Sequence, residues 1–218
     1  MTSIHKTQEE IILHLNQLTG HSYLLEKCGR PKIPKLFIKI LQLMLTSIQE
    51  KPQRIISYCV STALLRMGIV VHEQVSLEDE KDVDVFQKKQ LSILAGDYYS
   101  SLFYKTLAHH NEIEGMQVLS RTASQICEAN MQHHIDGTFD PFKQEDWTGH
   151  QLLTALADFF HVHKQVEWCS LLSYYLHLDH HRTPKMGRAA FLKCMESIEP
   201  ESVQSVLYQM LLDKEAIH

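Results

Sequence analysis

The chain has 218 residues, of which 44% are hydrophobic, and its formal net charge at pH 7 is −5. This length and apolar content suit one well-packed domain over residues 1–218. Acidic and basic residues are mixed along the chain without the clustered basic face that nucleic-acid binding needs, so nucleic acid is not an expected partner.

The first half of the chain shows three helical patterns. Apolar residues recur at helical spacing over residues 7–18, around 37–48 and over 52–75, and the stretch "KCGRPKIPK" breaks the first pattern from the second. Pro52 suits the first position of the third helix. An acidic connection, "SLEDEKDVD", follows that helix.

A fourth helix is predicted over residues 90–108, "QLSILAGDYYSSLFYKTLA". Gly96 and Asp97 interrupt its middle, although glycine costs about 1 kcal/mol in a helix interior and a buried carboxylate needs a partner. Ser92, Gly96 and Ser100 are four residues apart and form a small-residue stripe, which predicts a close helix crossing. The pattern places a buried face on the residues Leu91, Leu94, Ala95, Tyr98 and Leu102.

The second half continues as helices over 112–135, 147–163 and 164–180, and Pro200 divides two short closing helices. Glycine and proline are scarce, at 8 and 6 residues, and no strand pattern or repeat stands out. We therefore predict an all-α bundle of eight or nine helices.

The polar N-terminus lacks an apolar signal core, and no apolar run approaches the ~20 residues of a membrane span. The five cysteines form no C-x-x-C pair, which favours reduced, mostly buried thiols. A cytoplasmic protein is expected. His177 and His181 are four residues apart and could seat a metal, but surface or capping histidines are the simpler interpretation of the fifteen histidines.

The segment "LAGDYYSSLFYKTLA" resembles the L-A-G-D helix of the all-trans polyprenyl diphosphate synthases, which are all-α enzymes. In those enzymes the preceding helix ends in a D-D-x-x-D motif that holds magnesium ions against a substrate diphosphate. The preceding helix here ends "MGIVVHEQVSL", so His72-Glu73-Gln74-Val75 stands where the synthases have H-D-D-V/I.

The aspartate motifs are degenerate in this chain. Only Glu73 remains of the first motif, because Gln74 is neutral and Leu77 replaces the third carboxylate. The second motif is reduced to a lone acid, Asp179, in "YYLHLDHHRT". The acidic run 78–82 fits the letters of the motif but lies late, in a charged connection that is typical of a solvated loop. We therefore expect neither a catalytic residue nor a metal site in this chain.

This combination resembles component I, the small subunit of bacterial heterodimeric heptaprenyl or hexaprenyl diphosphate synthases. The resemblance implies a truncated isoprenoid-synthase-like fold and a chain that is inactive alone. It also implies a large catalytic partner subunit that binds Mg²⁺, and a role in activity and in the length of a product that supplies the menaquinone side chain. The L-A-G-D helix and the next helix are then expected to form the subunit contact, through Ser92, Gly96, Asp97, Tyr98, Tyr99, Ser100, Phe103 and Tyr104. Self-association is expected without the partner.

Two other functions stay open from sequence alone. One is a diverged, Mg²⁺-dependent class I terpenoid or prenyl synthase that uses Glu73 or the acids of 78–82 and is active by itself. The other is an unrelated all-α scaffold protein. The low number of carboxylates at the helix ends disfavours the enzyme.

Overall fold

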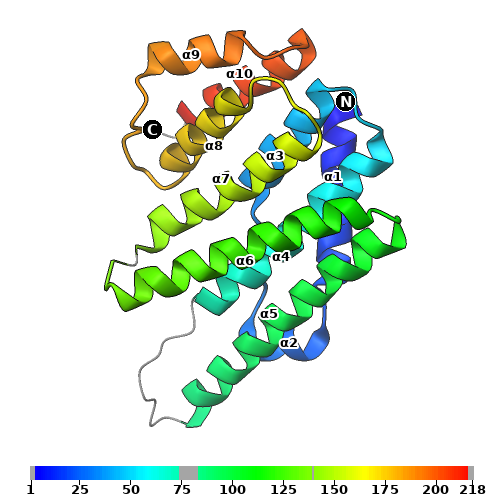
Figure 1. Ribbon diagram of the computed structural model, residues 1–218, viewed down its shortest axis with the longest axis vertical. Coiled ribbons are helices and arrows are strands. Elements are labelled where there is room, and N and C mark those ends of the chain that lie inside the picture. Colours follow the sequence, from blue (N-terminus) through cyan, green and yellow to red (C-terminus); the bar gives the residue numbers. More distant parts are fainter. Residues whose placement is uncertain (1–2, 74–82, 139, 216–218) are drawn as a thin grey trace.

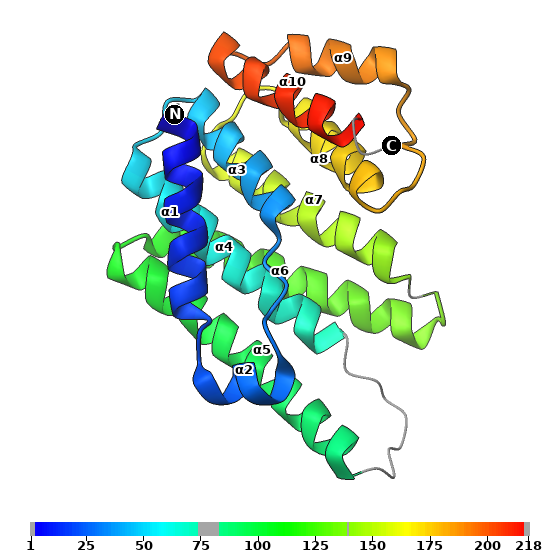
Figure 2. The same ribbon diagram turned by 180° about the vertical axis from the view of Figure 1, so that it is seen from behind.

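The computed structural model describes residues 3–73, 83–138 and 140–215. The described part of the chain folds into ten α-helices and contains no strand (Figures 1 and 2). They are α1 (Ser3–Leu18), α2 (Ser22–Cys28), α3 (Lys35–Ser47), α4 (Pro52–Glu73), α5 (Val83–His109), α6 (Ile113–Ile135), α7 (Pro141–Phe159), α8 (Gln165–Asp179), α9 (Arg188–Glu196) and α10 (Glu201–Glu215).

The all-α prediction is confirmed, but the predicted number of helices is too low. The missed element is α2, a seven-residue helix that buries one side chain, Leu24. Two turns are too few for a periodic pattern to stand out, and the helix ends at Gly29, whose φ of +79° stops it. The helix predicted from residue 147 begins instead at Pro141, a residue suited to a first helical position.

Helix α4 is the centre of the bundle. It packs against α1, α3, α5, α6 and α7, and Figures 1 and 2 show α6 on one face of it and α1 on the opposite face. Every residue from position 55 to position 69 is buried, so this helix has no solvated side over its middle. Contrary to the expectation from sequence, α4 is long and apolar enough to cross a membrane, and its burial shows that it is a core helix.

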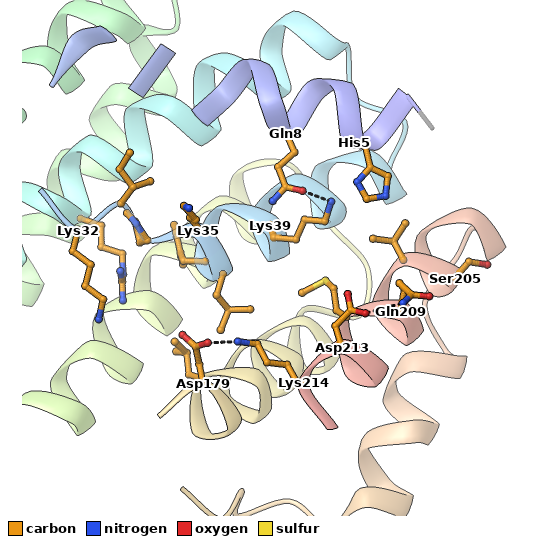
Figure 3. A pocket seen from close by; sticks show the side chains of 18 of the residues that line it. His5, Gln8, Lys32, Lys35, Lys39, Asp179, Ser205, Gln209, Asp213 and Lys214 are labelled. Carbon is orange, nitrogen blue, oxygen red and sulfur yellow. Dashed lines mark hydrogen bonds and ion pairs between the residues drawn. The ribbon is translucent and has the colours of Figure 1, made fainter. Parts of the chain in front are cut away.

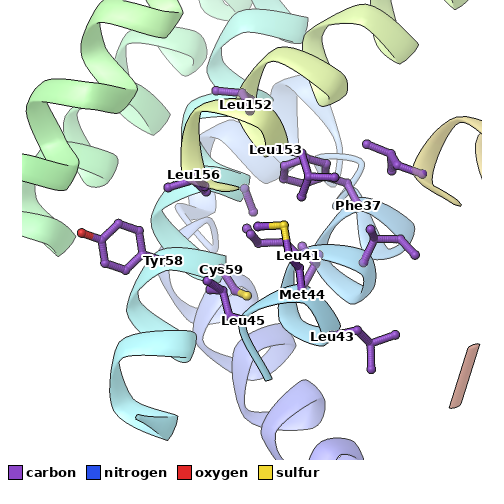
Figure 4. Packing of buried hydrophobic residues seen from close by; sticks show 14 of the residues in the cluster. Phe37, Leu41, Leu43, Met44, Leu45, Tyr58, Cys59, Leu152, Leu153 and Leu156 are labelled. Atoms are coloured by element: carbon purple, nitrogen blue, oxygen red, sulfur yellow. The ribbon is translucent and has the colours of Figure 1, made fainter. Parts of the chain in front are cut away.

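Apolar side chains of α3, α4 and α7 pack together in the core (Figure 4). Phe37 and Met44 of α3, Tyr58 and Cys59 of α4, and Leu153 of α7 are almost completely buried there. Each such side chain contributes roughly 1.5–3 kcal/mol through burial, so this cluster fixes how the three helices stack.

All five cysteines are free thiols. Burial raises the pKa of Cys59, which keeps that thiol protonated and unreactive. The expectation of mostly buried thiols is wrong for Cys28 and Cys127, which are exposed.

Candidate subunit-contact face and motif remnants

The small-residue stripe of α5 lies at a close crossing with α4 inside this chain. A Cβ built at Gly68 of α4 would lie 2.7 Å from the Ser100 hydroxyl and 3.0 Å from the Gly96 carbonyl oxygen. A Cβ built at Gly96 would lie 2.6 to 2.8 Å from ring atoms of His72. The missing side chains therefore let the two helices approach each other, and the His72 ring of α4 fills the space beside Gly96.

Asp97 pairs with His72, but not because it is buried. Its Oδ1 lies 3.3 Å from Nε2 of His72, and its side chain is 68% exposed. The expected cost of burying this carboxylate does not arise. The pair instead lies at the solvent-facing edge of the α4–α5 crossing.

The aromatic residues after Asp97 divide into two groups. Tyr99 and Phe103 are buried in the core of this chain, so the expectation that they anchor a partner does not fit the structure. Tyr98 is half-buried, and its hydroxyl donates to the Leu18 carbonyl oxygen at 3.2 Å. Tyr104 is 47% exposed and is the one of the four that extends well into solvent.

Exposed apolar side chains are concentrated on α5 and α6, which meet at the turn between them and diverge toward their far ends (Figure 1). These two helices carry eight of the twelve large apolar side chains that are exposed in the described part of the chain. Leu94 is among them, 59% exposed, although the sequence pattern placed it on the buried face. We call these residues the α5–α6 apolar face: Val85, Phe86, Ile93, Leu94, Tyr104, Ile113, Met131 and Ile135.

The helical register aligns part of this face. Phe86, Ile93 and Tyr104 are separated by seven and eleven residues, which are close to two and three full turns, so they line one stripe of α5. Met131 and Ile135 are one turn apart on α6. The α5–α6 apolar face therefore includes one aligned stripe on α5 and one neighbouring pair on α6.

The remnants of the two aspartate motifs are engaged within the chain. Glu73 is the last residue of α4 and accepts a hydrogen bond from the Asn130 amide of α6. Asp179 is the last residue of α8 and pairs with Lys214 of α10. Gln74, Leu77 and the acids of 78–82 lie outside the described residues.

The acids that the structure describes do not fit a magnesium cluster. Glu73 and Asp179 are single carboxylates, each already held by a neighbouring side chain. Over residues 3–73, 83–138 and 140–215, no three His, Cys, Asp or Glu side chains gather into a group that could hold a metal ion. That includes His177 and His181. Mg²⁺ needs oxygen ligands converging at close to octahedral geometry, and isolated carboxylates do not provide it.

A partly buried hydrogen-bond network, which the sequence did not reveal, holds the start of α6 against α4. Arg54 donates from Nε to Glu112 Oε1 at 2.6 Å and from Nη2 to Oε2 at 3.0 Å, and the Tyr58 hydroxyl donates to Oε2 at 2.8 Å. The hydrogen bonds from Arg54 hold the pKa of Glu112 below its usual value. Residue 112 lies 58 positions from Arg54, so no local pattern could reveal this contact. It sets the position of the first turn of α6, the helix that carries three of the eight residues of the α5–α6 apolar face.

Comparison with solved structures finds geranylgeranyl pyrophosphate synthetase from the archaeon Geoglobus acetivorans. The two chains share 11% sequence identity, the match covers 98% of this chain and 90% of that chain, and the TM-score is 0.48. The family model described as heptaprenyl diphosphate synthase (HEPPP synthase) subunit 1 matches residues 21–204, which is most of the chain. The resemblance seen in the sequence is thereby confirmed, and the chain belongs to the heptaprenyl diphosphate synthase subunit 1 family.

Proposed function

We propose that this chain is the non-catalytic, regulatory subunit of a heterodimeric heptaprenyl or hexaprenyl diphosphate synthase. In this proposal it is required for activity and for product chain length, and the product supplies the menaquinone side chain. A large catalytic subunit in the cytoplasm provides the aspartate motifs and the Mg²⁺. The observation that carries the proposal is the state of the motif remnants, because Glu73 and Asp179 are each held within the chain.

The α5–α6 apolar face is proposed as the surface that contacts the large subunit. Stable interfaces are rich in apolar and aromatic side chains at their centre, and obligate ones bury about 2,000 Å² or more in total. Phe86, Leu94 and Tyr104 would leave solvent on binding. Without the partner the same face stays exposed, which is the reason to expect self-association.

Catalytic silence distinguishes this proposal from an enzyme that is active alone. The isolated chain, incubated with farnesyl diphosphate, isopentenyl diphosphate and Mg²⁺, should form no elongated product. Addition of a large subunit from the same genome should give long prenyl diphosphates. Elongation by the isolated chain would overturn the proposal and favour the diverged synthase.

The assay needs an internal control for contamination by host synthases. Glu73→Gln in the isolated chain serves this purpose, because an activity that used Glu73 would be lost in the variant while a contaminant's activity would not. In the reconstituted complex, Glu73→Gln should leave turnover close to wild type.

A further inference from the structure

Two of the cavities in the described part of the chain touch α8. One has a volume of about 860 Å³, lies between α1, α3, α8 and α10, and is lined by Lys39 and the motif remnant Asp179 (Figure 3). The second cavity lies where α7 packs between α6 and α8 (Figure 1). Its volume is about 740 Å³, within the range of roughly 300–1,000 Å³ that is usual for small-molecule sites. Neither Glu73 nor Asp179 lines the second cavity, so it is separate from the motif remnants.

Two neighbouring residues of α7 give the second cavity an aromatic surface and a hydrogen-bond acceptor. Trp147 lines the cavity and is half-buried against the core. Asp146 also lines it, and its Oδ2 accepts a hydrogen bond from the Ser173 hydroxyl of α8 at 3.1 Å. Its Oδ1 is buried, and no described residue donates to it, which is costly for a carboxylate oxygen. A ligand group that donates a hydrogen bond would satisfy this oxygen.

Positive charge exceeds negative charge in the lining of the second cavity, in a protein whose net charge is −5. Arg182 and Lys185 come from the connection between α8 and α9, and Lys143 comes from the first turn of α7. Lys143 also forms an exposed pair with Asp140, with 3.6 Å between Nζ and Oδ2. Asp146 is the only carboxylate among the described lining residues. Three histidines complete the titratable lining: His133, His150 and His177. The lining therefore favours a ligand with more than one negative charge.

The end of α8 fixes the main chain of Arg182 beside the second cavity. The N–H groups of His181 and Arg182 donate to the carbonyl oxygens of Leu178 at 3.0 Å and His177 at 2.8 Å. With a φ of +53° at His181, this is the hydrogen-bond pattern of a Schellman turn, which folds the chain back against the helix end. His177 is 6% exposed and donates from Nδ1 to the Ser173 carbonyl oxygen at 2.8 Å, so its ring is also held in place.

We propose that the second cavity binds a purine nucleotide. The base stacks on Trp147, and its amino group donates a hydrogen bond to Oδ1 of Asp146. The phosphates lie against Arg182 and Lys185. Aromatic side chains are common stacking partners of bases, and the planar guanidinium of arginine matches two phosphate oxygens at once. Inorganic phosphate would leave Trp147 and Asp146 without a partner, and an apolar ligand would leave the cations without one.

Tryptophan fluorescence of the full, isolated chain reports this binding, because the chain has only two tryptophans. Trp168 is 1% exposed in the core, whereas Trp147 lines the cavity. Titration with ATP or GTP should quench the emission of Trp147, because a base would stack on its indole ring. Calorimetry then compares the two nucleotides with inorganic tripolyphosphate, adenosine and guanosine, and at least one nucleotide should bind ten-fold or more tightly than all three. The proposed partner subunit is absent from this test, so its outcome is independent of the proposed function.

Arg182→Met should weaken binding of the nucleotide at least ten-fold. Arg30→Met is the matched control, because Arg30 is exposed and lies outside the cavity, and it should bind as wild type does. Trp147→Leu should weaken nucleotide binding at least ten-fold without changing the affinity for tripolyphosphate, which separates stacking from charge. Thermal unfolding shows whether each variant is folded, and Arg182→Met, at an exposed residue, carries the test if Trp147→Leu is not. The proposal is overturned if neither nucleotide binds, if tripolyphosphate binds equally well, or if the folded cavity variants bind as wild type does.

Discussion

The ring of His72 on α4 covers Gly96 on α5 so closely that a Cβ at residue 96 would lie 2.6 Å from its Nε2. The same nitrogen lies 3.3 Å from Oδ1 of the adjacent Asp97. Glycine at this position therefore permits an interhelical pair that any larger residue would displace. This relationship explains why a helix tolerates glycine next to an aspartate in its middle.

A double-mutant cycle tests that explanation. Gly96→Ala gains about 1 kcal/mol of helix propensity, but in the wild type this gain should be offset because the His72 ring must move away. In a His72→Ala background the ring is absent, so Gly96→Ala should raise the free energy of unfolding. Urea denaturation of the four proteins gives the coupling energy, and a coupling near zero would contradict the explanation.

Gly68→Ala should be more damaging than Gly96→Ala. The new Cβ would meet a main-chain atom, the Gly96 carbonyl oxygen, at 3.0 Å, and a helix backbone cannot swing aside as a histidine ring can. We expect a loss of about 1–3 kcal/mol in the free energy of unfolding. Gly187→Ala is the control, because nothing lies within 4 Å of its added Cβ and its φ is −68°. Equal free energies of unfolding for Gly68→Ala and Gly187→Ala would rule out a tight crossing at Gly68.

The Arg54–Glu112 pair should make stability depend on pH. The pKa of Glu112 is lowered in the folded protein from its ordinary value of 4.5, so its contribution is complete above that value and is lost as pH falls through the folded pKa. Glu112→Gln should therefore be less stable than wild type near pH 7, and the difference should shrink toward pH 3. Glu114→Gln, at an exposed acid in the same turn, supplies the comparison, and an identical pH profile for both variants would refute the assignment.

The proposed partner contact can be tested by placing a charge on the α5–α6 apolar face. Leu94→Glu should leave the fold intact, because Leu94 is 59% exposed, but should weaken co-purification with the large subunit ten-fold or more. Val166→Glu on α8 is the matched control, since Val166 is 76% exposed and lies outside that face. Loss of the complex with both variants, or with neither, would remove the evidence for this surface.

Sequence periodicity predicted the helices that the core needs, and it failed where contacts rather than periodicity decide. The buried stretch of α4 was evident from its apolar residues, whereas the two-turn helix α2 was not. Leu94 shares a helical face with Ala95, and nothing local shows that α4 covers one and leaves the other in solvent. The pairing of Arg54 with Glu112 joins elements that only the folded chain brings together.

For the motif remnants, the sequence showed which carboxylates are missing but not which residues the remaining ones contact. The sequence alone showed that Glu73 and Asp179 lack companions, because a missing carboxylate is visible without coordinates. Their partners were not visible: Asn130 and Lys214 lie 57 and 35 positions away. The role of Lys39 was equally hidden, since it lies among the apolar residues of α3, and only the packing of α1 and α10 shows that it lines a cavity.

Lys39 should leave a signature in the alkaline pH dependence of stability. Its pKa is lowered by burial from 10.5 to about 8, so the folded protein releases this proton at a lower pH than the unfolded chain does. Between about pH 8 and pH 10.5 the unfolded chain binds more protons, and Lys39 therefore contributes a stability that rises with pH over that interval. The cavity that Lys39 lines also has other charged or titratable residues, and these are common to wild type and variant: His5, Lys32, Lys35, Arg66, Asp179, Asp213 and Lys214. Lys39→Met removes only the contribution of Lys39, so the stability of wild type relative to the variant should increase from pH 8 to pH 10.5. Urea denaturation of both proteins across that range measures the difference.

A constant difference would show that Lys39 titrates as an ordinary surface lysine, and a difference that decreases with pH would show that a bound or neighbouring anion already compensates its charge.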